Sequence, residues 1–218
     1  PRGTVVRTEE ELDQAIEKFG YPLVIKPIDG NHGKGNTTNI TNRNQAIKAF
    51  DAAKVYSRSV IVERFITGYD FRCLVINYKF ICAALRTPAS VVGDGVHDIR
   101  YLIEEVNKDP RRGYGHEKVL TQITVDQFTQ KMLDDAGITL ETVPPKGERV
   151  LLKPTANLST GGTSTDITDE VHPANIFMFE RIARIIGLDI CGIDVMAMDL
   201  KTPVAENGGA ILEVNAAP

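Results

Sequence analysis

Apolar residues recur at helix and strand spacings through the first third of the chain. Thr8 and Glu11 have the spacing of a capping box, and the apolar positions after them repeat every three or four residues until Gly20. This pattern predicts an amphipathic helix that ends at Gly20. Short apolar runs predict further elements in this part of the chain: strands at 22–26, 37–40 and 60–63, and a helix at 44–53. We expect a small α+β lobe with a βαβ-like opening.

From residue 65 onward the strands become longer and alternate more clearly. Two apolar runs, 71–76 and 80–85, flank Asn77-Tyr78-Lys79, which is typical of a tight antiparallel hairpin. Other elements are expected as helices near 99–106, 126–136 and 173–186, and as strands near 149–153, 190–198 and 210–215. We therefore expect two α+β lobes, residues 1–64 and 65–218, the second built on a mainly antiparallel sheet. The polar, Gly-rich stretch 88–115 is expected at the surface.

Composition narrows the class of protein. The 218 residues are 42% hydrophobic and 25% charged, with a net charge of −4, which is ordinary for a globular domain and argues against general nucleic-acid or membrane-surface binding. No signal peptide and no apolar run of membrane-spanning length occurs in the sequence. Three widely spaced cysteines, Cys73, Cys82 and Cys191, predict buried, reduced thiols and a cytoplasmic location. Because the chain begins at Pro1 without Met and stops directly after a predicted strand, we expect it to be an excised core of a larger protein.

Three oxygen-bearing side chains stand on two predicted strands near the end of the chain. Asp194 lies within an apolar run, and Glu213 and Asn215 lie within the next. An unpaired carboxylate buried in such a strand would be pushed towards its neutral form, whereas a divalent cation would stabilise the charged form. Mg²⁺ prefers oxygen ligands, so we predict a magnesium site at Asp194, Glu213 and Asn215.

A lysine and a Gly-rich loop form a second candidate site. Lys26 ends an apolar strand, where a charge is costly unless it has a partner. The backbone N–H groups of the loop that follows, which contains Gly33, Lys34 and Gly35, could close over phosphates. The loop lacks the spacing of a P-loop, and a flexible hairpin with a solvated Lys34 is the alternative. Together with the predicted metal site, the pattern indicates ATP.

The segment 62–72 connects the predicted lobes. Its backbone could meet the edge of a purine, and Asp70, two residues after Gly68, could accept ribose hydroxyls. The alternative is that Glu63, Asp70 and Arg72 form surface ion pairs worth about 0–1 kcal/mol.

The stretch 153–166 is rich in hydroxyls and glycine. Its Ser159-Thr160-Gly161-Gly162 run exposes several N–H and O–H donors, which suits a carboxylate or a phosphate; a solvated polar loop is the alternative. The sequence shows no Ser-His-Asp or Cys-His arrangement, which argues against acyl-enzyme chemistry.

These residues stand in recognisable motifs. The stretches VIKPIDGNHGKG, VIVERFITGYDFRCLVI, NKDPRRGYGHEKVLT, TANLSTGGTSTDITDEVHP and GLDICGIDVM…GAILEVNAAP resemble the ATP-grasp superfamily, and in particular the ATP-grasp region of cyanophycin synthetases. The resemblance implies an ATP-grasp fold, in which two α+β lobes hold the nucleotide between them. The resemblance also implies that full synthetases carry an N-terminal domain and a Mur-ligase-like domain, which we expect to lie outside the sequence given.

The resemblance also implies roles for individual residues. Nucleotide contacts would come from Lys26, Gly33, Lys34, Gly35, Glu63, Arg64, Ile66 and Asp70. Magnesium would be bound by Asp194, Glu213 and Asn215. The acceptor and the acyl phosphate would meet Ser159, Thr160, Gly161 and Gly162, with Arg86 and Lys153 as the catalytic cations.

The implied reaction is ATP-dependent ligation. A carboxylate of a peptide or poly-aspartate acceptor would attack ATP to give an acyl phosphate, and the amine of aspartate would then displace phosphate. Gly192 stands where the related D-alanine ligases have an arginine, so Arg86 is our candidate for the cation at the transferring phosphoryl group. The alternatives are a glutathione-synthesis-type ligase, which shares the Asn-Leu-Ser-Thr-Gly-Gly stretch, and a non-catalytic ATP-binding fragment. The parent enzyme is expected to be a homo-oligomer that needs neither nucleic acid nor membrane.

Overall fold

The computed structural model describes residues 2–29, 34–115 and 117–216. It divides into two compact units, Pro1–Thr67 with Gly208–Leu212, and Gly68–Asn207 with Glu213–Pro218. The sequence placed the boundary between lobes after residue 64, three residues before the division between these units. In the described parts of the chain, no helix has both the length and the apolar character needed to cross a membrane.

Unit 1 is a four-stranded sheet with two helices. In chain order its elements are β1 (Gly3–Val6), α1 (Glu9–Phe19), β2 (Leu23–Pro27), β3 (Thr37–Ile40), α2 (Arg43–Lys54) and β4 (Val60–Arg64). The sheet order is β1-β4-β2-β3, and all of these neighbours pair antiparallel. The expected βαβ-like opening is therefore wrong: β1 was not predicted from the sequence, and no helix among the described residues of this unit connects two parallel neighbouring strands.

Local signals set the ends of α1 as expected. Thr8 Oγ1 accepts a hydrogen bond from the Glu11 N–H at 3.2 Å, and Gly20 ends the helix with a φ of 67°. Glu11 departs from the usual capping box, since its Oε2 accepts from the Arg7 N–H at 2.6 Å. The apolar faces of α1 and α2 then pack on the sheet to form a core that contains Leu12, Phe50 and the central strand residues.

Unit 2 contains a five-stranded sheet of order β11-β6-β5-β12-β13. Its elements are β5 (Tyr69–Ile76), β6 (Lys79–Thr87), β7 (Ser90–Val92), α3 (Ile99–Asn107), β8 (Arg112–Gly113), β9 (Leu120–Thr121), α4 (Gln127–Asp135), β10 (Arg149–Leu151), η1 (Leu158–Thr160), β11 (Thr163–Asp166), η2 (Thr168–Glu170), α5 (Pro173–Ile186), β12 (Ile190–Ala197) and the second half of β13 (Ala210–Asn215), whose first residues are counted with unit 1. The expected α+β class with a mainly antiparallel sheet is confirmed, although β8 and β9 pair parallel.

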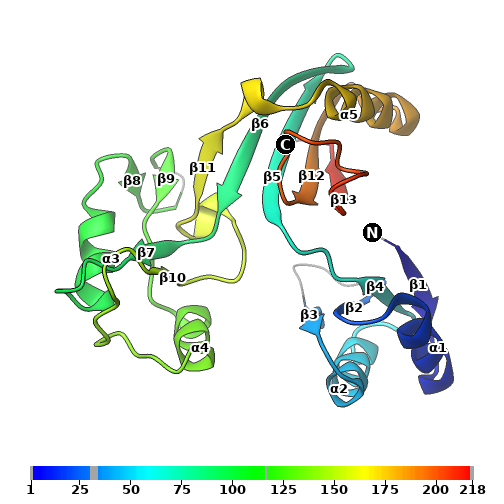
Figure 1. The fold of residues 1–218 in the computed structure, drawn as a ribbon, viewed down its shortest axis with the longest axis horizontal. Helices are drawn as coiled ribbons and strands as arrows, with labels where there is room; N and C mark the ends of the chain where they lie inside the picture. The colour runs from blue at the N-terminus through cyan, green and yellow to red at the C-terminus, as the bar shows by residue number, and fades with distance from the viewer. Residues whose placement is uncertain (1, 30–33, 116, 217–218) are drawn as a thin grey trace. The chain divides into compact units, whose positions relative to one another are not determined.

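The predicted hairpin is confirmed and organises the large sheet. Asn77 and Tyr78 form its two-residue turn with φ values of 51° and 59°, as in the type I′ turn that matches strand twist. The helix α5 packs on β5, β6 and β12 (Figure 1), and Phe179 meets Phe80 at a ring separation of 6.1 Å. The opposite face of the sheet, which α5 does not cover, carries Asp70, Arg72, Arg86 and Asp194.

A second core of unit 2 lies between α3, α4 and the β7–β10 pair. Residues 88–115 contribute several members of this core, including Val91 and Ile99, so the expectation that the stretch lies at the surface is wrong for much of its length. The cysteines are free, with Cys73 and Cys191 buried and Cys82 half-buried; full burial was therefore wrong for Cys82.

Candidate functional site

Four charged residues gather on one face of the large sheet. The hairpin places Asp70 opposite Arg86, and the pairing of β5 with β12 places Arg72 opposite Asp194. Because alternate residues of a strand share a face, Asp70 and Arg72 point to the same side. The sheet itself therefore creates the cluster, without help from loops.

The cluster is a connected set of ion pairs. Arg86 Nη2 lies 2.5 Å from Asp70 Oδ1 and 3.1 Å from Asp194 Oδ1, and Arg72 Nε lies 2.7 Å from the same Asp194 oxygen. The side chains of Arg86 and Asp194 are only 15% and 13% exposed, so these are not surface ion pairs. Burial raises the pKa of Asp70 above its ordinary value, and this effect exceeds the opposing effect of the Arg86 hydrogen bond.

The three predicted magnesium ligands lie together beside this cluster. An amide atom of Asn215 lies 3.3 Å from Asp194 Oδ2. The amide fits best with its nitrogen donating to Glu213 Oε1 at 3.0 Å and its oxygen accepting from Arg72 Nη1 at 3.3 Å. In that orientation the atom that faces Asp194 Oδ2 is the amide oxygen, and two facing acceptors favour a cation between them.

The donor set therefore fits a hard cation. The buried Asp194 Oδ1 has no hydrogen bond in suitable geometry, although two guanidinium groups approach it, while Oδ2 faces Asn215. Within the parts of the chain that the structure describes, no three His, Cys, Asp or Glu residues form a metal-binding group. The candidate site consists instead of two carboxylates and one amide.

A pocket of about 370 Å³ opens next to the two arginines. Its lining residues are Arg72, Ala84, Arg86, Asn157, Leu158, Ser159 and Ser164. Of the predicted acceptor residues, Ser159 lines the pocket, whereas Thr160, Gly161 and Gly162 continue the same loop and are not among the lining residues. The loop closes on itself because the Asn157 carbonyl accepts from the N–H groups of Thr160 and Gly162, both at 3.1 Å.

Lys153 is the other predicted catalytic cation. Its side chain is only 2% exposed, and its Nζ lies 2.6 Å from Asp126 Oδ2, but no acceptor meets the ammonium in hydrogen-bonding geometry. Asp126 also begins α4 by accepting from the N–H groups of Phe128 and Thr129. A buried ammonium with unused donors is prepared to meet an anion.

The predicted nucleotide residues of unit 1 form a smaller group. Lys26 Nζ lies 2.7 Å from Glu63 Oε2, across the adjacent strands β2 and β4. Lys34 and Gly35 follow in the turn before β3, and Gly35 has a φ of 73°. Gly33 lies outside the described residues.

The remaining predicted nucleotide contacts lie near the end of β4 and the start of β5. Arg64 is exposed and Ile66 is half-buried. Asp70 is held by Arg86 within unit 2.

Sequence reasoning missed several residues of these clusters. Arg72 was considered only as a surface charge, and Asp126 only as a helix start. Asn157 was not considered individually. The alternation of β5 could have identified Arg72, since it shares a face with Asp70; nothing in the sequence pairs Asp126 with Lys153.

Comparison with known proteins identifies the family. The model of the ATP-grasp domain matches residues 1–77, and the chain is 52% identical over its whole length to cyanophycin synthetase of Trichormus variabilis. The chain belongs to the ATP-grasp family. It spans about a quarter of the length of these curated relatives: 24% for T. variabilis and 25% for the cyanophycin synthetase of Crocosphaera subtropica, to which it is 53% identical.

The ATP-grasp fold is shared with solved structures. A bifunctional glutathione synthetase from Pasteurella multocida superposes with a TM-score of 0.69 and 31% identity, over 100% of this chain and 30% of that one. D-alanine–D-alanine ligase from Bacillus anthracis gives a TM-score of 0.55 at 13% identity, over 100% of this chain and 51% of that one, which shows the fold alone. The expected ATP-grasp architecture is thus confirmed.

Proposed function

We propose that this chain is the ATP-grasp region of an ATP-dependent acid–amino-acid ligase of the cyanophycin synthetase type. A carboxylate at the end of a poly-aspartate acceptor takes the γ-phosphoryl group of ATP, which yields an acyl phosphate and ADP. The amine of aspartate then attacks the acyl carbon, and phosphate leaves as the amide bond forms. The sequence identity to cyanophycin synthetases, 52% and 53% over the whole of this chain, supports this substrate class over others.

The pocket beside Arg72 and Arg86 is the observation that carries the proposal. An acceptor carboxylate and its acyl phosphate are anions, and both guanidinium groups line the same pocket as Ser159. Arginine presents paired N–H donors that match carboxylate and phosphate oxygens. An entering anion would exchange places with the carboxylates of Asp70 and Asp194 as the partner of these donors.

Magnesium is assigned to the neighbouring oxygen donors. Asp194, Glu213 and Asn215 would hold it, and when bound it would supply positive charge to the ATP phosphates. Lys153 would add a fixed ammonium, since its unused donors are buried and its Nζ is held beside Asp126. Lys26, Lys34, Gly35, Glu63, Arg64, Ile66 and Asp70, together with Gly33, stay the proposed nucleotide contacts.

The test is a coupled assay for ADP with ATP, Mg²⁺, aspartate and a short aspartate-containing primer. ADP release that requires both primer and aspartate, with the primer growing by one residue in a mass spectrum, is the expected result. The assay uses the full-length protein that the gene encodes. If this protein releases no ADP in response to the primer, the substrate assignment is refuted.

A glutathione-synthesis-type ligase is the second candidate. The structural match to the bifunctional glutathione synthetase and 34% identity to the glutathione biosynthesis bifunctional protein of P. multocida favour it over other ligases. Glycine with γ-glutamylcysteine in the same assay separates the two candidates. A non-catalytic nucleotide-binding role would instead show Mg·ATP binding by calorimetry, with no ADP release for either substrate set.

A further inference from the structure

The run Asp109-Pro110-Arg111-Arg112 contains two neighbouring arginines with opposite environments. Arg111 is 70% exposed and is held by Asp109, whose Oδ2 accepts from Arg111 Nη2 at 2.7 Å. Arg112 is only 6% exposed. Among the described residues, no carboxylate lies within ion-pair distance of Arg112, so its burial needs another explanation.

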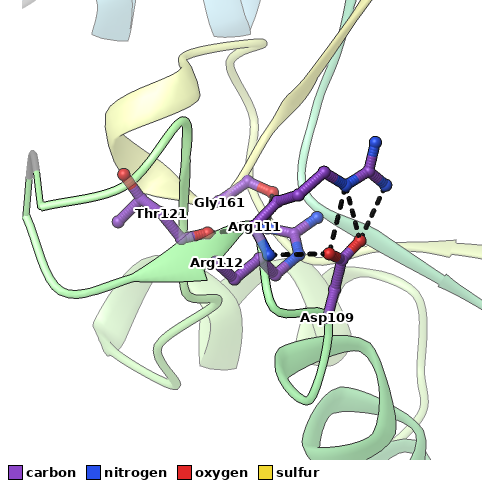
Figure 2. A network of polar contacts seen from close by, with 5 residues as sticks. All are labelled: Asp109, Arg111, Arg112, Thr121 and Gly161. Carbon is purple, nitrogen blue, oxygen red and sulfur yellow. Dashed lines mark hydrogen bonds and ion pairs between the residues drawn. The ribbon is translucent and has the colours of Figure 1, made fainter.

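The Arg112 guanidinium is used to join two backbone segments. Its Nη1 donates to the Thr121 carbonyl at 2.6 Å and to the Gly161 carbonyl at 3.0 Å, as Figure 2 shows. Thr121 lies on β9, which pairs parallel with the strand that contains Arg112, whereas Gly161 lies 49 residues after Arg112. The contact therefore connects the 109–121 segment to the loop that closes between Asn157 and Gly162.

Ile123, two residues after this segment, also contacts the loop. Ile123 is fixed to α3 by two hydrogen bonds with the Asn107 side chain, at 2.8 and 2.9 Å. A Cβ on Gly161 would come within 2.8 Å of Ile123 Cγ1, so the loop backbone rests directly on this residue. Gly161 is thus contacted on one side by Ile123 and bound through its carbonyl by Arg112.

We propose that Arg112 is a positioning residue for the acceptor pocket. It holds Gly161, and thereby keeps Asn157, Leu158 and Ser159 in the arrangement that lines the pocket beside Arg86. Arg112 itself does not line that pocket. This inference rests on the proposed function for the identity of the acceptor, but the positioning of the loop can be measured without it.

The test compares Arg112→Lys with Arg111→Lys in the full-length protein that the gene encodes. Lysine keeps the charge and most of the stem, but its Nζ ends one bond short of Nη1, the single nitrogen that donates to both carbonyls. We expect Arg112→Lys to raise the KM for the aspartate primer about tenfold or more, because small displacements of a binding group cost large factors, with the KM for ATP unchanged. Arg111→Lys should match the wild type in both.

Amide hydrogen exchange provides the second measurement. Arg112→Lys should speed exchange of the N–H groups of residues 160–162 at least tenfold, whereas Arg111→Lys should not, and the melting temperatures of both variants should stay close to the wild type. If the two variants exchange alike in this loop, the inference is overturned. If the wild type releases no primer-dependent ADP, the proposed function fails, and the exchange data alone decide whether Arg112 positions the loop.

Discussion

The pair between Lys153 and Asp126 allows stability and activity to be separated by mutation. Asp126→Asn removes the carboxylate charge but keeps a side chain that caps a helix equally well, so the α4 start is preserved. The buried Lys153 ammonium then loses the carboxylate that lies 2.6 Å from it. We expect Asp126→Asn to destabilise the fold through this loss.

The structure sets the size of the effect. Two unit charges at 2.6 Å attract by about 6 kcal/mol at an effective dielectric constant of 20 and by about 1.6 kcal/mol in water. Asp126 is 43% exposed while Lys153 is 2% exposed, so the true value lies between these limits. We expect the free energy of unfolding to fall by about 2–4 kcal/mol, near the range for removing one partner of a buried pair.

Lys153→Met is the matched variant. It removes the buried charge and leaves an apolar side chain of similar length, so the free energy of unfolding should change by less than about 1 kcal/mol or increase. Because Lys153 is the proposed phosphate-binding cation, the same variant should lose ligase activity. The double variant should be about as stable as Lys153→Met alone.

Urea unfolding followed by far-ultraviolet circular dichroism measures these differences, and pH provides a check. Burial raises the pKa of Asp126, but its contact with Lys153 and the Thr129 N–H outweigh this, so the pKa lies below the usual 3.8. A carboxyl with a depressed pKa stabilises the fold above its unfolded pKa and loses this contribution as pH falls through the folded pKa. The gap between wild type and Asp126→Asn should stay constant from about pH 8 to about pH 5 and shrink below about pH 4. A gap under about 0.5 kcal/mol at neutral pH would refute the reasoning.

Three further predictions concern the other sites. Glu213→Gln should abolish Mg²⁺-dependent ADP release with little change in melting temperature, because Glu213 is exposed. Asp194→Asn should abolish ADP release as well and should lower the free energy of unfolding by about 1–3 kcal/mol, since it removes the partner of two guanidinium groups. Near-normal ADP release from either variant would contradict the metal assignment. Gly161→Ala should destabilise the protein more than Gly187→Ala, because both glycines have positive φ but only the Gly161 site has atoms within 4 Å of a new Cβ; equal melting temperatures would count against the tight loop packing. With a thiol reagent at about pH 8, Cys82 should react first, since burial raises the pKa of Cys73 to about 12 and also raises that of Cys191; rapid labelling of all three thiols, followed by mass spectrometry of peptides, would argue against this burial.

The sequence identified most elements of the fold because their signals are local. Thr8, Gly20 and Pro173 mark helix ends by their own chemistry, and Asn77-Tyr78 marks the hairpin turn. The strand β1 is short and partly exposed, so its apolar pattern is too weak to predict it. Missing that strand made an antiparallel sheet resemble a βαβ unit.

The charged cluster could not be derived from the turn alone. Counting back from a two-residue turn would place Asp70 opposite Leu85. A bulge between Leu74 and Val75 shifts the register by one and places Asp70 opposite Arg86 instead. A one-residue shift in register moves every side chain of a strand to the other face of the sheet. The residues of this stretch do not predict the bulge.

Contacts between distant segments were equally invisible. The sequence shows two adjacent arginines at 111 and 112, but the parallel pairing of β8 with β9 decides that the second one is buried. The same holds for Lys153, whose partner Asp126 is known only once α4 is placed. Such pairs arise from tertiary packing, which hydrophobic periodicity does not encode.

The cluster of Asp70, Arg72, Arg86 and Asp194 contains two positive and two negative charges in contact. Its field therefore weakens with distance much faster than that of two bare arginines, and at physiological ionic strength it is screened within about 8 Å. An anionic acceptor approaching from solution would feel little attraction from this cluster until it reaches the pocket. Its association rate should then depend only weakly on salt, and discrimination between acceptors would be made at contact and not by long-range steering.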